Sequence, residues 1–205
     1  EPGLNVVLTL DMIIQQAAEN ALRSRGADTR GAVVVMDVQN GNILALASLP
    51  AFDPNAYVQG ISHSYMAWLN NAEHPPQPNR AMQENYAPGS IFKIIISLAC
   101  LEGGLDPKEK IRHPGHIYVG RRLIDDTAPA GEYDFHLGFI RSSNAYFITN
   151  GIKAGIERIV RVARQFHLGE QTGLLPHQET PGYLPSLREV QVGWTPGDTA
   201  NMCMG

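Results

Sequence analysis

Apolar residues gather in short blocks along the first quarter of the chain, and their spacing predicts a strand, a helix and a hairpin. Residues 5–10 are expected to form a short strand, after which Asp11 would cap a helix that ends at Gly26. Two apolar runs follow at residues 31–36 and 43–49, joined by a turn containing Asn40-Gly41. Because neither run alternates with polar residues, we expect both strands to be covered on both faces.

The rest of the chain is more irregular, and its blocks predict mainly helices. A short helix is expected at residues 65–69, and a longer one at residues 90–101, which is apolar nearly all round and should be buried. Short strands are expected at 117–119 and 122–124, one helix after residues 142–144, and an amphipathic helix over residues 156–166. This mixed order, without regular strand–helix alternation, predicts an α+β fold.

Composition narrows the class of protein. The chain has 205 residues, of which 43% are hydrophobic and 18% charged, with a formal net charge of −4. This content can close a core and excludes intrinsic disorder, while the acidic balance argues against a nucleic-acid partner. There is no apolar run long enough to span a membrane and no signal peptide. Cys100 and Cys203 lack metal-ligand spacing, and no zinc-protease motif occurs.

The most informative local feature is the segment from Pro88 to Lys93. Ser90 lies at the start of the predicted apolar helix, close to unpaired backbone N–H groups, and Lys93 falls on the same face of the first turn. Burial would lower the pKa of the lysine, and a neutral amine beside a hydroxyl is a general base beside a nucleophile. The alternative is that Ser90 only caps the helix and Lys93 extends to the surface.

A second candidate is Ser142-Ser143-Asn144, before another predicted helix. Ser142 could relay a proton and Asn144 could hold a substrate amide, although the triplet taken by itself favours a plain helix cap. An S-x-x-K tetrapeptide alone occurs by chance about once in 200 residues, so it is weak evidence. The two motifs together are more specific, because serine acyl-enzymes that react with penicillins combine them.

With these motifs, the chain resembles the transpeptidase domain of class B penicillin-binding proteins along nearly its whole length. The first hairpin, the segment Asn79–Ala81 and the segment Tyr86–Lys93 are similar to that family. The segment Trp194–Thr199 resembles the elongation type, penicillin-binding protein 2. The resemblance implies the α+β fold of penicillin-binding proteins and serine β-lactamases, an antiparallel sheet flanked by helices.

The resemblance also implies roles for the motif residues. Ser90 would be the acylated nucleophile, Lys93 its base, Ser142 the proton relay and Asn144 the group that binds the substrate amide. The substrates would be peptidoglycan stem peptides ending in D-Ala-D-Ala, and β-lactams would acylate the same serine. The family further implies a membrane glycosyltransferase as partner, a single-pass anchor in the inner membrane and a periplasmic location. Neither a cofactor nor a nucleic acid is expected.

The sequence departs from the family pattern in three respects. There is no Lys-[Ser/Thr]-Gly motif, so residues 1–205 are expected to be a partial transpeptidase domain with little activity alone. The anchor and pedestal domain of the family are also absent from these residues. Some members resemble zinc proteins near the site, but His113, Asp125, Glu132 and Ser143, which occupy the corresponding positions, match in type only once. We therefore predict no metal, and we expect Asp125-Asp126 to be a solvated turn.

Two other functions remain open from the sequence. A serine β-lactamase would share Ser90 and Lys93, but nothing resembles the acidic loop that activates the deacylating water in class A enzymes. A β-lactam sensor or a wall-synthesis scaffold would bind without catalysing cross-linking. Acylation alone does not separate a sensor from an enzyme.

Overall fold

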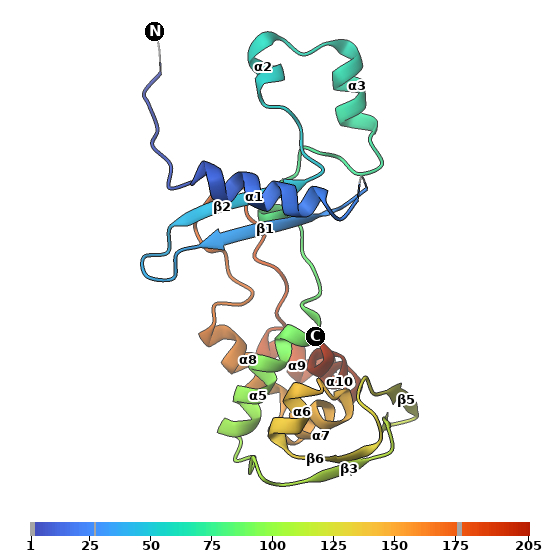
Figure 1. The fold of residues 1–205 in the computed structure, drawn as a ribbon. Coiled ribbons are helices and arrows are strands. Elements are labelled where there is room, and N and C mark those ends of the chain that lie inside the picture. Colours follow the sequence, from blue (N-terminus) through green and yellow to red (C-terminus); the bar gives the residue numbers. More distant parts are fainter. Residues whose placement is uncertain (1–2, 27, 176–177) are drawn as a thin grey trace. The chain divides into compact units, whose positions relative to one another are not determined.

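The computed structural model describes residues 3–26, 28–175 and 178–205, and the chain divides into two compact units. The first unit comprises Glu1–Asn85 and Gly173–Thr180, and the second comprises Tyr86–Thr172 and Pro181–Gly205. Both combine helices with antiparallel strands (Figure 1), so the predicted α+β class is confirmed. Among the described residues, none of the helices has the length and apolar character needed to cross a bilayer.

The first unit is a hairpin with a helix packed on it. Helix α1 (Met12–Arg23) begins at Asp11, whose Oδ1 accepts hydrogen bonds from the backbone N–H groups of Ile13 at 2.8 Å and Ile14 at 3.1 Å. Strands β1 (Gly31–Met36) and β2 (Ile43–Leu49) form the predicted antiparallel hairpin. The remaining helices are α2 (Asn55–Gln59), α3 (His63–Asn71) and α4 (Arg80–Gln83). A small core joins α1 to β2: Ala18, Leu22, Ala45, Ala47 and Leu49.

Two expectations for this unit are wrong. Residues 5–10 form no strand, because contact with β2 is limited to bonds such as Asp11 N–H to Leu44 O and Thr9 Oγ1 to Ile43 O, which do not build a ladder. Nor is the hairpin covered on both faces. One face packs on α1, while the other leaves Val34 48% and Met36 52% exposed.

The second unit carries the larger core, built from helices. Helix α5 (Lys93–Glu102) follows the 3₁₀ turn η1 (Gly89–Phe92) and contacts α7 (Asn144–Ala154), α8 (Ile156–Gln165) and α10 (Pro196–Met204). The other helices are α6 (Phe135–Ile140) and α9 (Leu187–Gly193). Two antiparallel pairs complete it: β3 (Ile111–His113) with β6 (Gly131–Tyr133), and β4 (His116–Val119) with β5 (Arg122–Asp125). Five of these elements were expected from the sequence: α5, α7, α8, β4 and β5. The sequence pattern does not predict β3, β6, α6, α9 or α10.

Helix α5 is less enclosed than its composition suggests. Ile95, Ile96, Ala99 and Cys100 are buried against the neighbouring helices. The opposite side is not covered within the described chain, since Ile94 is 51% exposed and Leu98 37%. The expectation of a fully buried central helix is therefore only half right, because the neighbouring helices cover one side of it.

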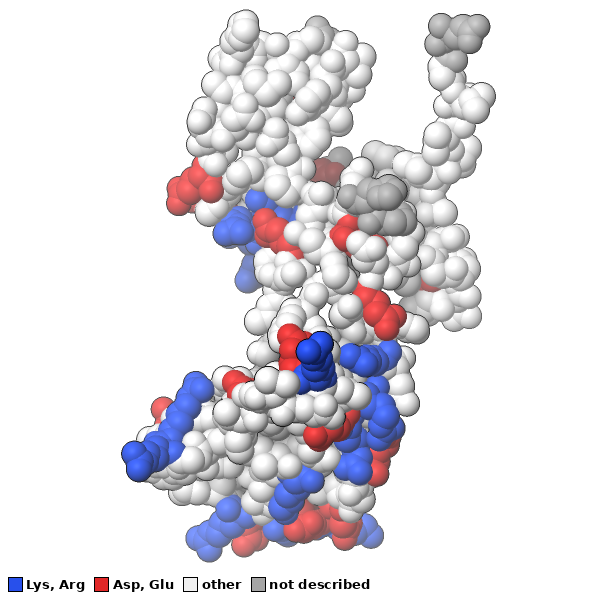
Figure 2. Space-filling view, turned by 180° about the vertical axis from the view of Figure 1, so that it is seen from behind, with Lys and Arg blue, Asp and Glu red and all other residues white. Residues whose placement is uncertain are grey.

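On the face of the second unit that Figure 2 shows, acidic and basic side chains are interspersed. This face, in a chain with a net charge of −4, is unlike the continuous basic surface that binds a nucleic-acid backbone.

Candidate active site

The start of α5 places Ser90 and Lys93 as the sequence predicts. Gly89 has a φ of 59°, a left-handed conformation that suits glycine, and it turns the chain into η1. Ser90 is exposed within this turn, whereas Lys93, the first residue of α5, is only 2% exposed. The alternative in which Lys93 extends to the surface is therefore wrong, and its amine lies inside the second unit.

The start of α7 separates the two serines of the triplet. Ser143 caps the helix, with its Oγ accepting from the backbone N–H of Tyr146 at 3.1 Å. Ser142 has a φ of 53°, which is uncommon for a residue other than glycine, and its hydroxyl turns toward α5. The cap interpretation thus applies to Ser143, and Ser142 is left for another role.

A chain of hydrogen bonds joins the four predicted site residues. The Nζ of Lys93 donates to Ser142 O at 2.6 Å, to Ser142 Oγ at 3.0 Å and to Asn144 Oδ1 at 2.7 Å. Ser142 Oγ in turn lies 3.0 Å from Ser90 Oγ and donates to it. Because Ser142 bridges Ser90 and Lys93, a proton could pass between the serine hydroxyl and the amine through one intermediate oxygen.

The surroundings of Lys93 favour its neutral form. Burial lowers the pKa of its amine below 10.5, while the negative charge of Asp126 and the nearby thiol of Cys203 oppose the shift. The ring of Phe147 lies 5.8 Å from Nζ and forms part of the apolar wall. A larger fraction of Lys93 is thus neutral near pH 7 than of a lysine in water, as a general base requires.

Asp126 is a functional candidate that sequence reasoning missed. Its side chain is fully buried, not part of a solvated turn, although its neighbour Asp125 is exposed as expected. It accepts hydrogen bonds from Ser143 Oγ at 2.6 Å and from the backbone N–H of Asn144 at 2.6 Å and of Ala145 at 3.1 Å. Burial would raise the pKa of Asp126, but these bonds outweigh it and hold the pKa below its usual value. Local sequence gives no signal for this contact, because its partners lie on a different element.

The residues at the zinc-like positions do not fit a metal. His113 Nε2 lies 3.2 Å from Ser143 Oγ, and His113 Nδ1 accepts from the backbone N–H of Gly115 at 3.3 Å. A serine hydroxyl stands where a thiolate ligand would be needed, and it donates to Asp126. Among the described residues, no cluster of three or more His, Cys, Asp or Glu could hold a metal ion.

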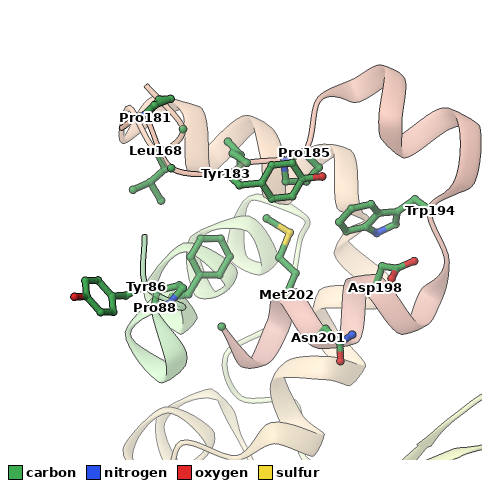
Figure 3. Close-up of a pocket in the computed structure, with 15 residues that line it drawn as sticks. Tyr86, Pro88, Leu168, Pro181, Tyr183, Pro185, Trp194, Asp198, Asn201 and Met202 are labelled. Atoms are coloured by element: carbon green, nitrogen blue, oxygen red, sulfur yellow. The ribbon is translucent and has the colours of Figure 1, made fainter. Parts of the chain in front are cut away.

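The segment Trp194–Thr199 builds the start of α10. Thr195 and Asp198 form a reciprocal capping box, and the indole Nε1 of Trp194 donates to Thr199 Oγ1 at 2.9 Å. This segment borders a hollow of about 670 Å³, in which Trp194 and Asp198 lie at one end and Tyr86 and Pro88 at the other (Figure 3). Phe92 also lines it, so the hollow adjoins the turn that carries Ser90.

Comparison with known proteins decides the family. Residues 31–205 match the family model for the penicillin-binding protein transpeptidase domain. The chain belongs to this family. The resemblance inferred from the sequence is therefore confirmed.

Relatives of known name and structure agree with this assignment. The chain is 32% identical to the peptidoglycan D,D-transpeptidase MrdA of Acinetobacter baumannii, over 99% of this chain and 31% of that protein. It resembles penicillin-binding protein 2 of Pseudomonas aeruginosa, solved with WCK 5153, with a TM-score of 0.87 and 31% identity over 100% of this chain and 48% of that one. It also resembles penicillin-binding protein 2 of Helicobacter pylori in a complex with MreC, with a TM-score of 0.83 and 30% identity over 94% and 37% of the two chains. The chain spans about a third of the length of the curated relatives it matches.

Proposed function

We propose that this chain carries the acylation machinery of a peptidoglycan D,D-transpeptidase of the elongation type. The observation that carries the proposal is the continuous set of hydrogen bonds from Ser90 through Ser142 to the buried Lys93. Membership of the transpeptidase family and the names of the relatives support the same reaction. The substrates are stem peptides that end in D-Ala-D-Ala.

In the first half-reaction, Ser90 Oγ attacks the carbonyl carbon between the two terminal D-alanines. The proton of the hydroxyl passes through Ser142 to the neutral amine of Lys93 as the new O–C bond forms, and the negative charge develops on the carbonyl oxygen. The backbone N–H of Ser90 supplies one donor to the oxygen of the tetrahedral intermediate. When the peptide C–N bond breaks, Ser142 returns a proton to the leaving nitrogen, and D-alanine departs.

In the second half-reaction, an amine from a neighbouring stem peptide attacks the ester carbon of the acyl-enzyme. Lys93 and Ser142 take the proton from this amine and return it to Ser90 as the ester C–O bond breaks. A cross-linked peptide leaves and the serine hydroxyl is restored. Asn144 donates through its amide to the substrate backbone, while its Oδ1 holds the amine of Lys93.

The setting of this reaction follows from the same family relationship. We place the domain on the extracytoplasmic side of the inner membrane, where stem peptides are presented, carried by a single-pass anchor. The complex of the Helicobacter pylori relative with MreC supports a role within a larger assembly. The proposed partner in that assembly is a membrane glycosyltransferase, which supplies the glycan strands that the transpeptidase joins. β-Lactams, whose strained amide resembles D-Ala-D-Ala, acylate the same serine.

Intact-mass spectrometry after incubation of the full-length protein with a penicillin tests the proposal. We expect one adduct with the mass of the drug, absent from Ser90→Ala and retained in Ser64→Ala, which removes an exposed serine hydroxyl of the first unit. The adduct should persist for many minutes, because a transpeptidase lacks an activated water for deacylation.

The other outcomes point to other functions. Rapid loss of the adduct would identify a β-lactamase, and a stable adduct without cross-linking of stem peptides would identify a sensor. Acylation that survives in Ser90→Ala would contradict the assignment of the nucleophile.

A further inference from the structure

The loop after β5 contacts the start of α7, and Asp126 makes most of the hydrogen bonds between them. Both carboxylate oxygens of Asp126 are engaged: Oδ1 accepts from the backbone N–H groups of Asn144 and Ala128, and Oδ2 accepts from Ser143 Oγ and from the backbone N–H of Ala145. A carboxylate at a helix N-terminus is favoured by the unpaired N–H groups there and by the helix dipole. The charge of Asp126 therefore stabilises the first turn of α7.

The same loop also fixes Ser142. Thr127 Oγ1 donates to Ser142 O at 2.8 Å, the same carbonyl that accepts from Lys93 Nζ. Asp126 holds Ser143 and Asn144, the two residues that follow Ser142, so the loop after β5 fixes the backbone that leaves the left-handed Ser142. That conformation costs free energy and persists only where the surrounding contacts impose it.

We propose that Asp126 is a positioning residue for acylation of Ser90, acting through the first turn of α7 on Ser142, Asn144 and Lys93. It does not touch the reacting atoms. Its carboxylate keeps Ser142 Oγ between the nucleophile and the amine, and its negative charge acts on the protonation of Lys93. The inference rests on the proposed function for its effect on acylation, while its effect on Lys93 is measurable without any substrate.

The charged and titratable groups around Lys93 and Asp126 come from several elements. Lys93 is faced by Ser142 and Asn144 at the start of α7, by Cys203 from α10 and by the charge of Asp126. Asp126 is faced by His113 from β3, whose Nε2 lies 3.4 Å from Oδ2. The backbone N–H of Gly115 donates to Nδ1 of His113, so Nε2 is the ring nitrogen that can donate toward Ser143 and Asp126.

The test compares Asp126→Asn with Asp125→Asn in the full-length protein. The two substitutions remove the same charge from adjacent residues, but the side chain of Asp125 is exposed and that of Asp126 is buried. The rate of acylation by a fluorescent penicillin is measured over a range of pH. The pKa of Lys93 is followed separately by NMR of protein labelled with ¹³C at lysine Cε, with the signal assigned by its loss in Lys93→Arg.

We expect Asp126→Asn to slow acylation by up to about 100-fold, the loss that misplacing a catalytic group brings. Without the negative charge, the pKa of Lys93 should fall further, so the rising limb of the pH–rate profile should move to lower pH. Asp125→Asn should change neither. Asp126→Glu keeps the charge but moves the carboxylate, so it should restore the pKa of Lys93 more fully than the rate.

Several results would overturn the inference. If Asp126→Asn and Asp125→Asn gave the same rate and the same Lys93 pKa, Asp126 would have no such role. A lower rate with an unchanged Lys93 pKa and a lowered unfolding temperature would indicate structural support alone. Failure of the wild type to acylate would count against the proposed function, whereas the NMR titration would still decide whether Asp126 acts on Lys93.

Discussion

Ser142 and Ser143 are adjacent in sequence but serve the site in different ways. The φ of 53° at Ser142 turns its hydroxyl to Ser90, while Ser143 remains extended and caps α7. The backbone conformation thus makes Ser142 a reactive residue and Ser143 a structural one. We therefore expect the alanine variants of these two serines to have opposite effects on acylation and on stability.

Ser142→Ala should reduce acylation by about 10²- to 10⁴-fold, the usual contribution of a positioned proton-transfer group, with little change in stability. Ser143→Ala should lower the free energy of unfolding by about 1 to 3 kcal/mol, because it removes the cap and leaves buried polar groups unpaired. Urea unfolding and penicillin acylation, measured on both variants, check this. A larger stability loss for Ser142→Ala than for Ser143→Ala would contradict the assignment.

The sequence motifs predict the residues of the hydrogen-bonded chain, but they do not predict Asp126. Ser90, Lys93, Ser142 and Asn144 were expected from spacing and resemblance, and the structure brings all four together. Asp126 escaped notice because its role depends on a contact between the loop after β5 and the start of α7. Tertiary contacts of this kind leave no periodic signal in the sequence.

Among the helices of the second unit, α7 and α10 approach each other closely. Gly151 of α7 faces Cys203 of α10, and a Cβ at position 151 would lie only 2.2 Å from Cys203 Sγ. Cys203 is fully buried, and its burial raises the pKa of its thiol to about 12, so it packs as a small apolar residue. The two helices can pack at this distance because residue 151 has no side chain.

Gly151→Ala should therefore overpack this contact and lower the free energy of unfolding by about 1 to 3 kcal/mol. Gly193→Ala, at the end of α9 with open space around its Cα, is the matched control and should be neutral within about 0.5 kcal/mol. Adding Cys203→Ala to Gly151→Ala should recover part of the loss by removing the sulfur. The free energies of unfolding are measured with urea. If the losses of Gly151→Ala and Cys203→Ala simply add in the double variant, the contact with Cys203 is not what destabilises Gly151→Ala.

Element boundaries were predicted well where local chemistry determines them. Asp11 begins α1, the Asn40-Gly41 turn joins the hairpin, and α5 ends at Glu102, next to the predicted end at residue 101. The failures concern the environment of an element, not its type. Residues 5–10 have strand composition without a ladder, and α5 is apolar on a side that its neighbours do not cover. Composition shows what a segment could bury but not which partner it meets.

At the scale of the whole molecule, the two units differ in how much apolar surface they bury. The core of the first unit is a small cluster between α1 and one face of a two-stranded hairpin. The core of the second unit joins α5, α7, α8 and α10 around fully buried residues such as Ile96, Phe147 and Val160. Amides protected by a larger core open with a higher free energy.

Hydrogen exchange of the 205-residue chain, followed by mass spectrometry, should therefore separate the units. Peptides covering β1 and β2 should exchange before those covering α5 and α7. Leu49→Ala, in the core of the first unit, should accelerate exchange mainly in the hairpin, and Ile159→Ala mainly in α7 and α8, since each removes about 2 to 5 kcal/mol of local packing. The two units would open together if the peptides of the hairpin and of the helices exchanged equally fast, or if either variant accelerated exchange in both groups of peptides. The site would then depend on the hairpin for its stability, although the residues of the hydrogen-bonded chain from Ser90 to Lys93 all belong to the second unit.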